Sequence, residues 1–293
     1  RGFSARWRDW IALLLSSSSS SFLLNGVPGK KVRHRRGLRQ GDPLSPFLFI
    51  LAIDTLHHLL QAAAKQRIIA PLPGREIKVR ISLYADDAVI FANPVREEID
   101  ALMEILRDFG AASGLHINPS KSMALPIRCE NIDLGHILQK FGGTVGHFPT
   151  TYLGTPISDS RLTVADLRPT VTKLQTRIEP WQGRWLSKAA RTILINSSLS
   201  SLLLFLMSFY SLHETLHHEI AKVQSRFYWA GDNNKQKYHM VSWPDICKPR
   251  EQGGLGIMCS KRMNITLLTR WLWHISQGHG GLWLDIIRNK YLR

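Results

Sequence analysis

Cysteine and negative charge are both scarce in this sequence of 293 residues. The three cysteines, Cys129, Cys247 and Cys259, follow no regular spacing, which argues against a disulfide framework and indicates free thiols in a reducing, intracellular compartment, nucleus or cytoplasm. Asp and Glu number 22 against 38 Lys and Arg, so the formal net charge is +16. This excess of positive charge favours a polyanionic partner.

Targeting and membrane segments are lacking too. No signal peptide is visible, and the sequence begins at Arg1 without an initiator Met, so we expect a fragment of a longer chain. Residues 192–212 carry no charge and approach the ~20 apolar residues that a membrane-spanning helix needs. Seven Ser and Asn residues interrupt this run. The composition therefore favours a buried helix and no membrane partner.

The positive charge is concentrated in two stretches. Residues 1–41 hold nine Lys or Arg and one acid, Asp9, while residues 161–191 hold seven Lys or Arg and two acids. Clusters of this kind suit contact with a phosphate backbone, and a solvated basic surface is the alternative. The residues that we expect to lie along a nucleic-acid backbone are Lys30, Lys31, Arg33, Arg35 and Arg36.

Two adjacent carboxylates stand in the stretch 80–91. Apolar, β-prone residues lead into Asp86 and Asp87, and a second apolar run follows them, which predicts two strands with the acids at the turn. Close carboxylates repel each other. A divalent cation such as Mg²⁺, which prefers hard oxygen ligands, removes that repulsion. A polar hairpin turn that binds nothing is the alternative.

An upstream block favours the metal over the bare turn. Gly-Leu-Arg-Gln-Gly-Asp-Pro-Leu-Ser-Pro occupies residues 37–46, and Tyr-Ala-Asp-Asp occupies residues 84–87. In this order the two blocks resemble the palm of a reverse transcriptase, and more closely the enzymes of LINE-type (non-LTR) retrotransposons found in plant genomes. Further segments resemble that group in order and spacing: residues 114–122, 152–157, 188–196 and 253–256.

The resemblance implies an RNA-directed DNA polymerase that uses two metal ions. Its partners would be an RNA template, a DNA primer and deoxynucleoside triphosphates, and its cofactor would be Mg²⁺ or Mn²⁺. Asp86 and Asp87 would bind the metal. Lys121 would lie near the nucleotide phosphates as a general acid, with a surface lysine as the alternative. The resemblance assigns nucleotide or template contacts to Arg39, Gln40, Gly41 and Tyr84, and a primer grip to Tyr152, Leu153 and Gly154. The Tyr84 ring could support the primer end or fill the core, and Asp42 is expected to cap or brace its loop.

The implied fold belongs to the α+β class. A partial right-hand polymerase palm, an antiparallel sheet with packed helices, would be followed by a mainly helical thumb and C-terminal region. We expect the partial palm over 1–126, a connection with the primer-grip hairpin over 127–160, a helical thumb-like region over 161–230, and a loop-rich, then helical region over 231–293. Periodicity predicts helices over 1–15, 46–65 (capped by Ser45), 95–109, 127–143, 163–178 and 265–275, and strands over 22–25, 30–36 and 115–117.

One part of the implied metal site is missing. In the family, a further catalytic aspartate lies on a strand that would precede residue 1. Asp9 does not replace it, because it lies in a helical pattern with Trp7 and Trp10 and follows no strand. We therefore expect an incomplete site and no turnover by this chain alone. A nucleic-acid-binding remnant without catalysis is the alternative, and so is a product that never folds.

A different chemistry is suggested by residues 213–217. His213, Glu214 and His217 match the HExxH pattern of zinc proteases. Ile220 stands where the extended pattern has Gly. A zinc hydrolase is therefore a remote alternative. Trp181 and Trp185 suit either base stacking or a helical core.

Overall fold

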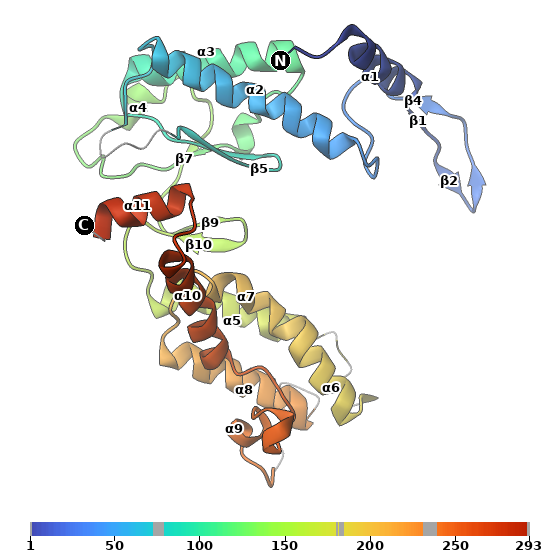
Figure 1. The fold of residues 1–293 in the computed structure, drawn as a ribbon, viewed down its shortest axis with the longest axis vertical. Coiled ribbons are helices and arrows are strands. Elements are labelled where there is room, and N and C mark those ends of the chain that lie inside the picture. The colour runs from blue at the N-terminus through green and yellow to red at the C-terminus, as the bar shows by residue number, and fades with distance from the viewer. Residues whose placement is uncertain (1, 73–78, 180, 182–184, 231–238, 292–293) are drawn as a thin grey trace. The chain divides into compact units, whose positions relative to one another are not determined.

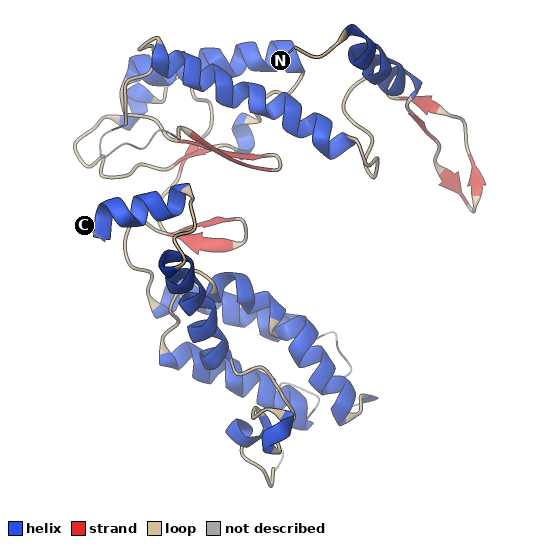
Figure 2. Cartoon of the chain, in the orientation of Figure 1, coloured by secondary structure: helices blue, strands red, loops and turns tan. Residues whose placement is uncertain are grey.

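The computed structural model describes residues 2–72, 79–179, 181, 185–230 and 239–291. The chain divides into two units, Arg1–Gly146 and His147–Arg293. This division falls inside the segment 127–160 that the sequence predicted as a connection. Helices and small sheets, most of them antiparallel, make up both units (Figure 2), so the predicted α+β class is confirmed.

The first unit begins with a helix and two short strand pairs. Helix α1 (Ala5–Ser17) begins after Ser4, whose hydroxyl accepts a hydrogen bond from the backbone N–H of Trp7. Strands β2 (Leu23–Leu24) and β3 (Val27–Pro28) form a hairpin around Asn25 and Gly26, both of which have positive φ. The basic strand predicted over 30–36 contains only β4 (Val32–Arg33), which pairs with β1 (Ser19–Ser20).

The serine run contributes to this pairing because a histidine holds it. The ring nitrogens of His34 lie 2.8 Å from the hydroxyl oxygens of Ser18 and of Ser20. These two contacts compensate for the weak intrinsic preference of serine for strands.

Two long helices and one hairpin form the core of the first unit. Helices α2 (Ser45–Lys65) and α3 (Arg96–Ser113) pack together, and the hairpin of β5 (Ile81–Tyr84) and β6 (Asp87–Ile90) packs against them (Figure 1). The predicted apolar face of α3 is confirmed. The buried residues of this core are Leu56, Leu60, Ala63, Ile69, Ile81, Leu102, Leu106 and Phe109.

Three local predictions for the first unit are wrong. Ser45 is the first residue of α2 and caps nothing; instead the Asp42 carboxylate accepts the N–H of Leu44 at 2.8 Å. Residues 115–117 form no strand; they belong to an irregular link between α3 and the short helix η1 (Pro119–Lys121). The helix predicted over 127–143 shrinks to α4 (Leu134–Ile137).

The remaining strands of the first unit pair in parallel. Strand β7 (Met123–Ala124) lies beside β8 (Thr144–Val145). The chain between them is therefore a crossover connection, and within it only α4 is helical.

The second unit is mainly helical, as predicted for residues 161–230. A hairpin of β9 (Thr150–Tyr152) and β10 (Thr155–Ile157) precedes the helices. The long helices are α5 (Val164–Ile178), α8 (Glu214–Ala230), α10 (Ser260–Ser276) and α11 (Leu282–Tyr291). The shorter ones are α6 (Lys188–Leu194), η3 (Ile195–Leu199), α7 (Ser201–Met207), α9 (Trp243–Ile246) and η4 (Arg250–Gln252).

The uncharged segment 192–212 lies in the core of the second unit. It packs with α5 and α8 through Ile195, Leu199, Leu203, Leu206 and Met207. By length and composition alone, two described helices are apolar enough to cross a membrane, Ser45–Lys65 and Lys188–Met207, and 17% and 44% of their most apolar stretches are buried. The prediction of a buried helix over this segment is confirmed, and the absence of a membrane partner stays a prediction.

Candidate functional site

The two carboxylates lie at the closed end of the β5–β6 hairpin. Tyr84 pairs with Asp87 across the ladder, so that Ala85 and Asp86 form a two-residue loop. Ala85 has a φ of 51°, a left-handed conformation that residues other than glycine adopt at a cost. A positive φ at the first loop position matches the right-handed twist of the two strands. The sequence prediction of two strands with the acids at the turn is confirmed.

The pleat of the hairpin separates a core face from an open face. Ile81, Leu83 and Ile90 belong to the core formed with α2 and α3. Because successive side chains of a strand alternate between faces, Tyr84 and Asp87 lie on the other face. Tyr84 is 62% exposed, which favours a contact surface over core filling for its ring.

Both carboxylates are exposed and uncompensated. Within the part of the chain that the structure describes, neither Asp86 nor Asp87 accepts a hydrogen bond or pairs with a cation. In the same part, no group of three or more His, Cys, Asp or Glu side chains is arranged to hold a metal ion. The hairpin therefore offers two hard oxygen ligands that suit a divalent cation, and leaves room for others.

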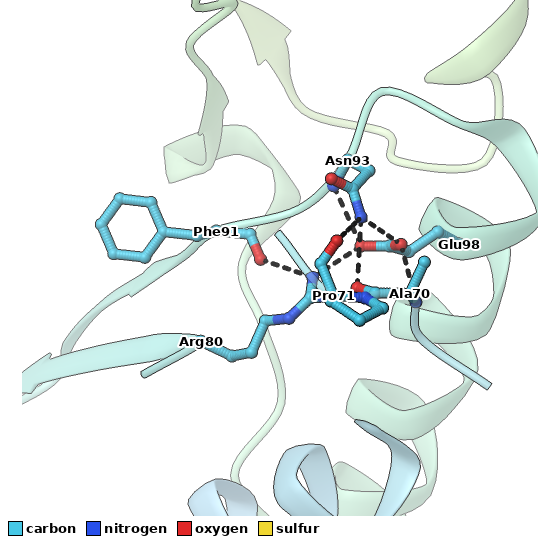
Figure 3. Close-up of polar contacts among 6 residues, drawn as sticks. All are labelled: Ala70, Pro71, Arg80, Phe91, Asn93 and Glu98. Carbon is cyan, nitrogen blue, oxygen red and sulfur yellow. Dashed lines mark hydrogen bonds and ion pairs between the residues drawn. The ribbon is translucent and has the colours of Figure 1, made fainter. Parts of the chain in front are cut away.

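A buried arginine closes the open end of the hairpin (Figure 3). The N–H of Phe91 donates to the carbonyl of Arg80 at 2.8 Å, and Arg80 Nη1 donates to the carbonyl of Phe91 at 3.2 Å. Arg80 is 7% exposed and forms an ion pair of 2.7 Å with Glu98 of α3. The sequence predicts a role for neither Arg80 nor Glu98, because two charged residues 18 positions apart do not match the periodic spacing of a helix or a strand.

The loop before α2 carries residues 37–44 of the Gly-Leu-Arg-Gln-Gly-Asp-Pro-Leu-Ser-Pro block. Arg39, Gln40 and Gly41 are exposed, and Gly41 has a φ of 84°, which a side chain would strain. The N–H of Asp42 donates to the carbonyl of Arg39, and the carboxylate of Asp42 accepts from Leu44. Asp42 thus braces the loop, as predicted, and leaves Gln40 open to solvent.

Comparison with known proteins identifies the family. The profile described as "Reverse transcriptase (RNA-dependent DNA polymerase)" matches residues 2–157, which is more than half of the chain and includes the loop and the carboxylate hairpin. This chain belongs to the reverse transcriptase family. The match spans the first unit and the β9–β10 hairpin of the second.

Two of three similar proteins are named as products of mobile elements. This reverse transcriptase is 30% identical to the transposon TX1 uncharacterized 149 kDa protein of Xenopus laevis over 88% of this chain and 19% of the relative. It is 29% identical to the Pol polyprotein of the type-2 retrotransposable element R2DM of Drosophila melanogaster over 41% of this chain and 11% of the relative. An uncharacterized mitochondrial protein of Arabidopsis thaliana is 44% identical over 22% of this chain and 56% of the relative.

These findings confirm the predicted membership in the non-LTR group of retrotransposon reverse transcriptases. The chain spans less than two thirds of the length of each of these relatives. The family as a whole uses divalent metal ions.

The other predicted site residues of the reverse transcriptase lie on short turns. Lys121 is exposed at the end of η1, which Asn118 caps through its side-chain oxygen. Tyr152 ends β9, and Leu153 and Gly154 form the loop of the β9–β10 hairpin with φ values of 49° and 77°. The predicted hairpin is therefore present, whereas its role as a primer grip and that of Lys121 stay predictions.

The basic side chains predicted to follow a nucleic-acid backbone are all accessible. They lie in and around β4, whose pairing with β1 keeps this part of the chain extended. The exposed residues are Lys30, Lys31, Arg33, Arg35 and Arg36.

The residues of the zinc-protease pattern make contacts within the fold instead. His213 precedes α8 and contacts Thr215, Glu214 pairs with Lys261 at 2.8 Å, and His217 is buried with its Nδ1 3.0 Å from the Ser260 hydroxyl. Burial lowers the pKa of His217. Because no described group of ligands could hold a metal, the described residues do not support the zinc alternative.

Aromatic and thiol side chains of the second unit are divided between core and surface. Trp181 packs against the core, with its ring centroid 5.4 Å from that of Phe227, whereas Trp185 is 75% exposed. The three cysteines are free, as predicted, and burial raises the pKa of Cys247 to about 12. Core packing thus accounts for Trp181, and base stacking stays open for Trp185.

Proposed function

We propose that this chain contributes the carboxylate hairpin and the nucleotide-binding loop to RNA-templated synthesis of DNA. In that reaction the 3′-oxygen of a DNA primer forms a bond to the α-phosphorus of a deoxynucleoside triphosphate, and the bond to pyrophosphate breaks. The observation that carries the proposal is the exposed, unpaired carboxylate pair of Asp86 and Asp87 at the tip of a hairpin in a family of RNA-dependent DNA polymerases.

Asp86 and Asp87 would hold Mg²⁺ or Mn²⁺. When bound, two such ions stabilise the attacking and the leaving oxygens of an in-line displacement. Asp86 projects from the loop and Asp87 from the open face of β6, so the two ligands approach a metal from neighbouring backbone positions. Tyr84, beside Asp87 on the same face, would support the primer end.

The other predicted residues would bind and orient the substrates. Gln40 offers both a donor and an acceptor to the incoming nucleotide, and Gly41 allows its backbone to approach closely. Arg39 would pair with template or triphosphate phosphates, and Lys121 would protonate the leaving pyrophosphate. Tyr152, Leu153 and Gly154 would hold the primer strand, and the basic residues around β4 would hold the nucleic-acid backbone.

Full catalysis needs a further carboxylate. A two-metal centre draws ligands from at least two chain segments, and the described residues bring only Asp86 and Asp87 together at the hairpin. We therefore propose that a carboxylate outside these residues completes the centre. The chain by itself is expected to bind metal weakly and to leave a primer unextended.

Titration with Mn²⁺ tests the metal site directly. The free ion is counted by its electron paramagnetic resonance signal in the presence of the purified 293-residue chain. We expect Asp86→Asn to abolish one class of binding, and Asp108→Asn, at a carboxylate of α3 that is 77% exposed, to leave it unchanged. Equal binding by wild type and Asp86→Asn would contradict the proposal.

Primer extension completes the test. A DNA primer annealed to an RNA template is incubated with the chain, Mg²⁺ and deoxynucleoside triphosphates. Extension that Asp86→Asn abolishes would show that the centre is complete within this chain, and would overturn the need for a further carboxylate. No extension by a folded chain that binds Mn²⁺ through Asp86 is the expected outcome.

A second function rests on the basic surface alone. The exposed residues around β4 suit binding of nucleic acid without turnover. This candidate predicts a salt-sensitive affinity for RNA together with Mn²⁺ binding that does not depend on Asp86.

A further inference from the structure

The β5–β6 hairpin needs an anchor if its tip is to hold a fixed position. In the described part of the chain it is a sheet of only two strands, with no neighbouring strand on either edge. A two-stranded hairpin by itself is marginally stable in water. Core packing through Ile81, Leu83 and Ile90 holds one face, but the tip with Asp86 and Asp87 extends into solvent.

Glu98 is the point where three chain segments meet (Figure 3). Its Oε1 accepts from Arg80 Nη1 at 2.7 Å and from the N–H of Asn93 at 2.9 Å. Its Oε2 accepts from Asn93 Nδ2 at 2.8 Å and from the N–H of Ala70 at 3.2 Å. One carboxylate therefore joins the start of β5, the link from β6 to α3 and the chain that follows α2.

Burial restricts the Arg80–Glu98 ion pair to one geometry. Arg80 is 7% exposed and Glu98 is 5% exposed. At low solvent exposure a charged pair is held in one geometry, because any other leaves a charge without a partner. Arg80 Nη1 also donates to the carbonyl of Phe91 at the end of the opposite strand. The pair thus fixes both strands of the hairpin to the first turn of α3.

The length of the hairpin amplifies any movement at this anchor. Asp86 lies six positions after Arg80 in the chain, which corresponds to about 20 Å of strand at ~3.3 Å per residue. A pivot of about 3° at the base then moves the tip by about 1 Å. A misplacement of about 1 Å in an active site can cost ~10²-fold in rate.

We propose that the Arg80–Glu98 pair is a positioning element that sets the orientation of the Asp86–Asp87 hairpin on α3. It acts on the reaction through the hairpin and touches neither substrate nor metal. Its importance for chemistry rests on the proposed function, because the orientation of the tip matters to catalysis only if Asp86 and Asp87 hold the metal.

Hydrogen exchange of the full chain, followed by mass spectrometry, tests the anchor. In Glu98→Gln and in Arg80→Met we expect the amides of residues 81–90 to exchange at least ~10-fold faster, while those of residues 99–113 in α3 stay within ~2-fold of wild type. Arg80→Lys, which keeps a cation able to donate to both partners, should stay within ~3-fold at the hairpin.

Leu106→Ala is the matched control for stability alone. Leu106 lies in the same core on α3, eight residues beyond Glu98. Its loss should raise exchange in α3 and in the hairpin together. Circular dichroism confirms that each variant is folded. Hairpin exchange that is unchanged in both Glu98→Gln and Arg80→Met, or that rises only in proportion to α3, would overturn the proposal.

Mn²⁺ binding separates this inference from the proposed function. Asp86 and Asp87 are adjacent in the chain, so Glu98→Gln should keep the Mn²⁺ affinity within ~2-fold of wild type. Mn²⁺ binding that Asp86→Asn does not alter would refute the metal site but not the anchoring of the hairpin. Faster exchange only near residues 81–90 would support the anchor in either case.

Discussion

At the scale of single residues, polar side chains have two opposite uses. The carboxylates of Asp86 and Asp87 are exposed and unpaired within the described residues, whereas Glu98 accepts four hydrogen bonds and is buried. His217 is buried against the Ser260 hydroxyl on α10. A buried, hydrogen-bonded group contributes to folding, and an exposed unpaired acid is available to a ligand.

The burial of His217 predicts that the second unit loses stability in acid. Burial lowers the pKa of His217 in the folded chain, so the unfolded chain binds a proton at a higher pH than the folded one. The stabilisation is present above the ordinary histidine pKa of ~6.5 and is lost as the pH falls through the lower folded value. Urea unfolding between pH 7.5 and ~5 should show a falling midpoint.

Two variants isolate this effect. His217→Asn should flatten the dependence of the unfolding midpoint on pH, because the Asn side chain does not titrate. His218→Gln, which changes the exposed neighbour, should leave it as in wild type. A pH dependence that His217→Asn does not alter would assign the acid sensitivity to another group.

At the scale of elements, apolar periodicity accounts for the helices that formed as predicted. Helix α5 buries Leu167, Val171, Leu174 and Ile178 at spacings of three and four residues, and it packs against α8. Its start is held by a capping box in which Thr163 and Asp166 exchange hydrogen bonds. In the segment 127–143, which connects the parallel strands β7 and β8, only α4 is helical.

The packing of α5 gives a prediction for stability. Leu174 is fully buried, and Leu174→Ala leaves a cavity between α5 and α8. We expect a loss of about 2–5 kcal/mol in the free energy of unfolding, measured by urea denaturation. Thr172→Ala, on the exposed side of the same helix, should change that free energy by less than ~0.5 kcal/mol. A similar loss in both variants would mean that the helix, not its core contact, is affected.

At the scale of the whole molecule, net charge is the dominant property. A formal charge of +16 attracts any polyanion, so affinity for nucleic acid by itself does not demonstrate polymerase activity. The carboxylate hairpin places two adjacent, exposed negative charges against this background, and a bound cation makes it compatible with a phosphate nearby.

The salt dependence of RNA binding measures how many basic residues take part. For single strands the slope of log K against log salt is about −0.7 per phosphate neutralised. Replacing Lys30, Lys31, Arg33, Arg35 and Arg36 together by Ala should reduce the slope by up to ~3.5 in a fluorescence-anisotropy titration with single-stranded RNA. Asp86→Asn should leave the slope unchanged. An unaltered slope in the fivefold variant would move the contact to other basic residues, such as those of 161–191.

The sequence by itself determined the family, the position of the carboxylates at a hairpin turn and most of the long helices. These features are local: a motif needs only its own residues, and an amphipathic helix or a two-residue loop is specified by spacing and by the preference of a few positions. The predictions of a strand over 115–117 and of a long helix over 127–143 are wrong: residues 115–117 pair with no described strand, and only Leu134–Ile137 is helical between 127 and 143. A short apolar run does not specify a strand unless another segment lies beside it.

Only the tertiary structure decided how the carboxylate hairpin is held. Arg80 and Glu98 are 18 residues apart and look like ordinary charged positions in the sequence. Folding nevertheless buries both and pairs them with each other. In the same way, folding turned the HExxH pattern into a buried histidine and a surface ion pair. Burial removes water as an alternative partner, so the contacts that a polar residue makes depend on which segments the fold brings beside it.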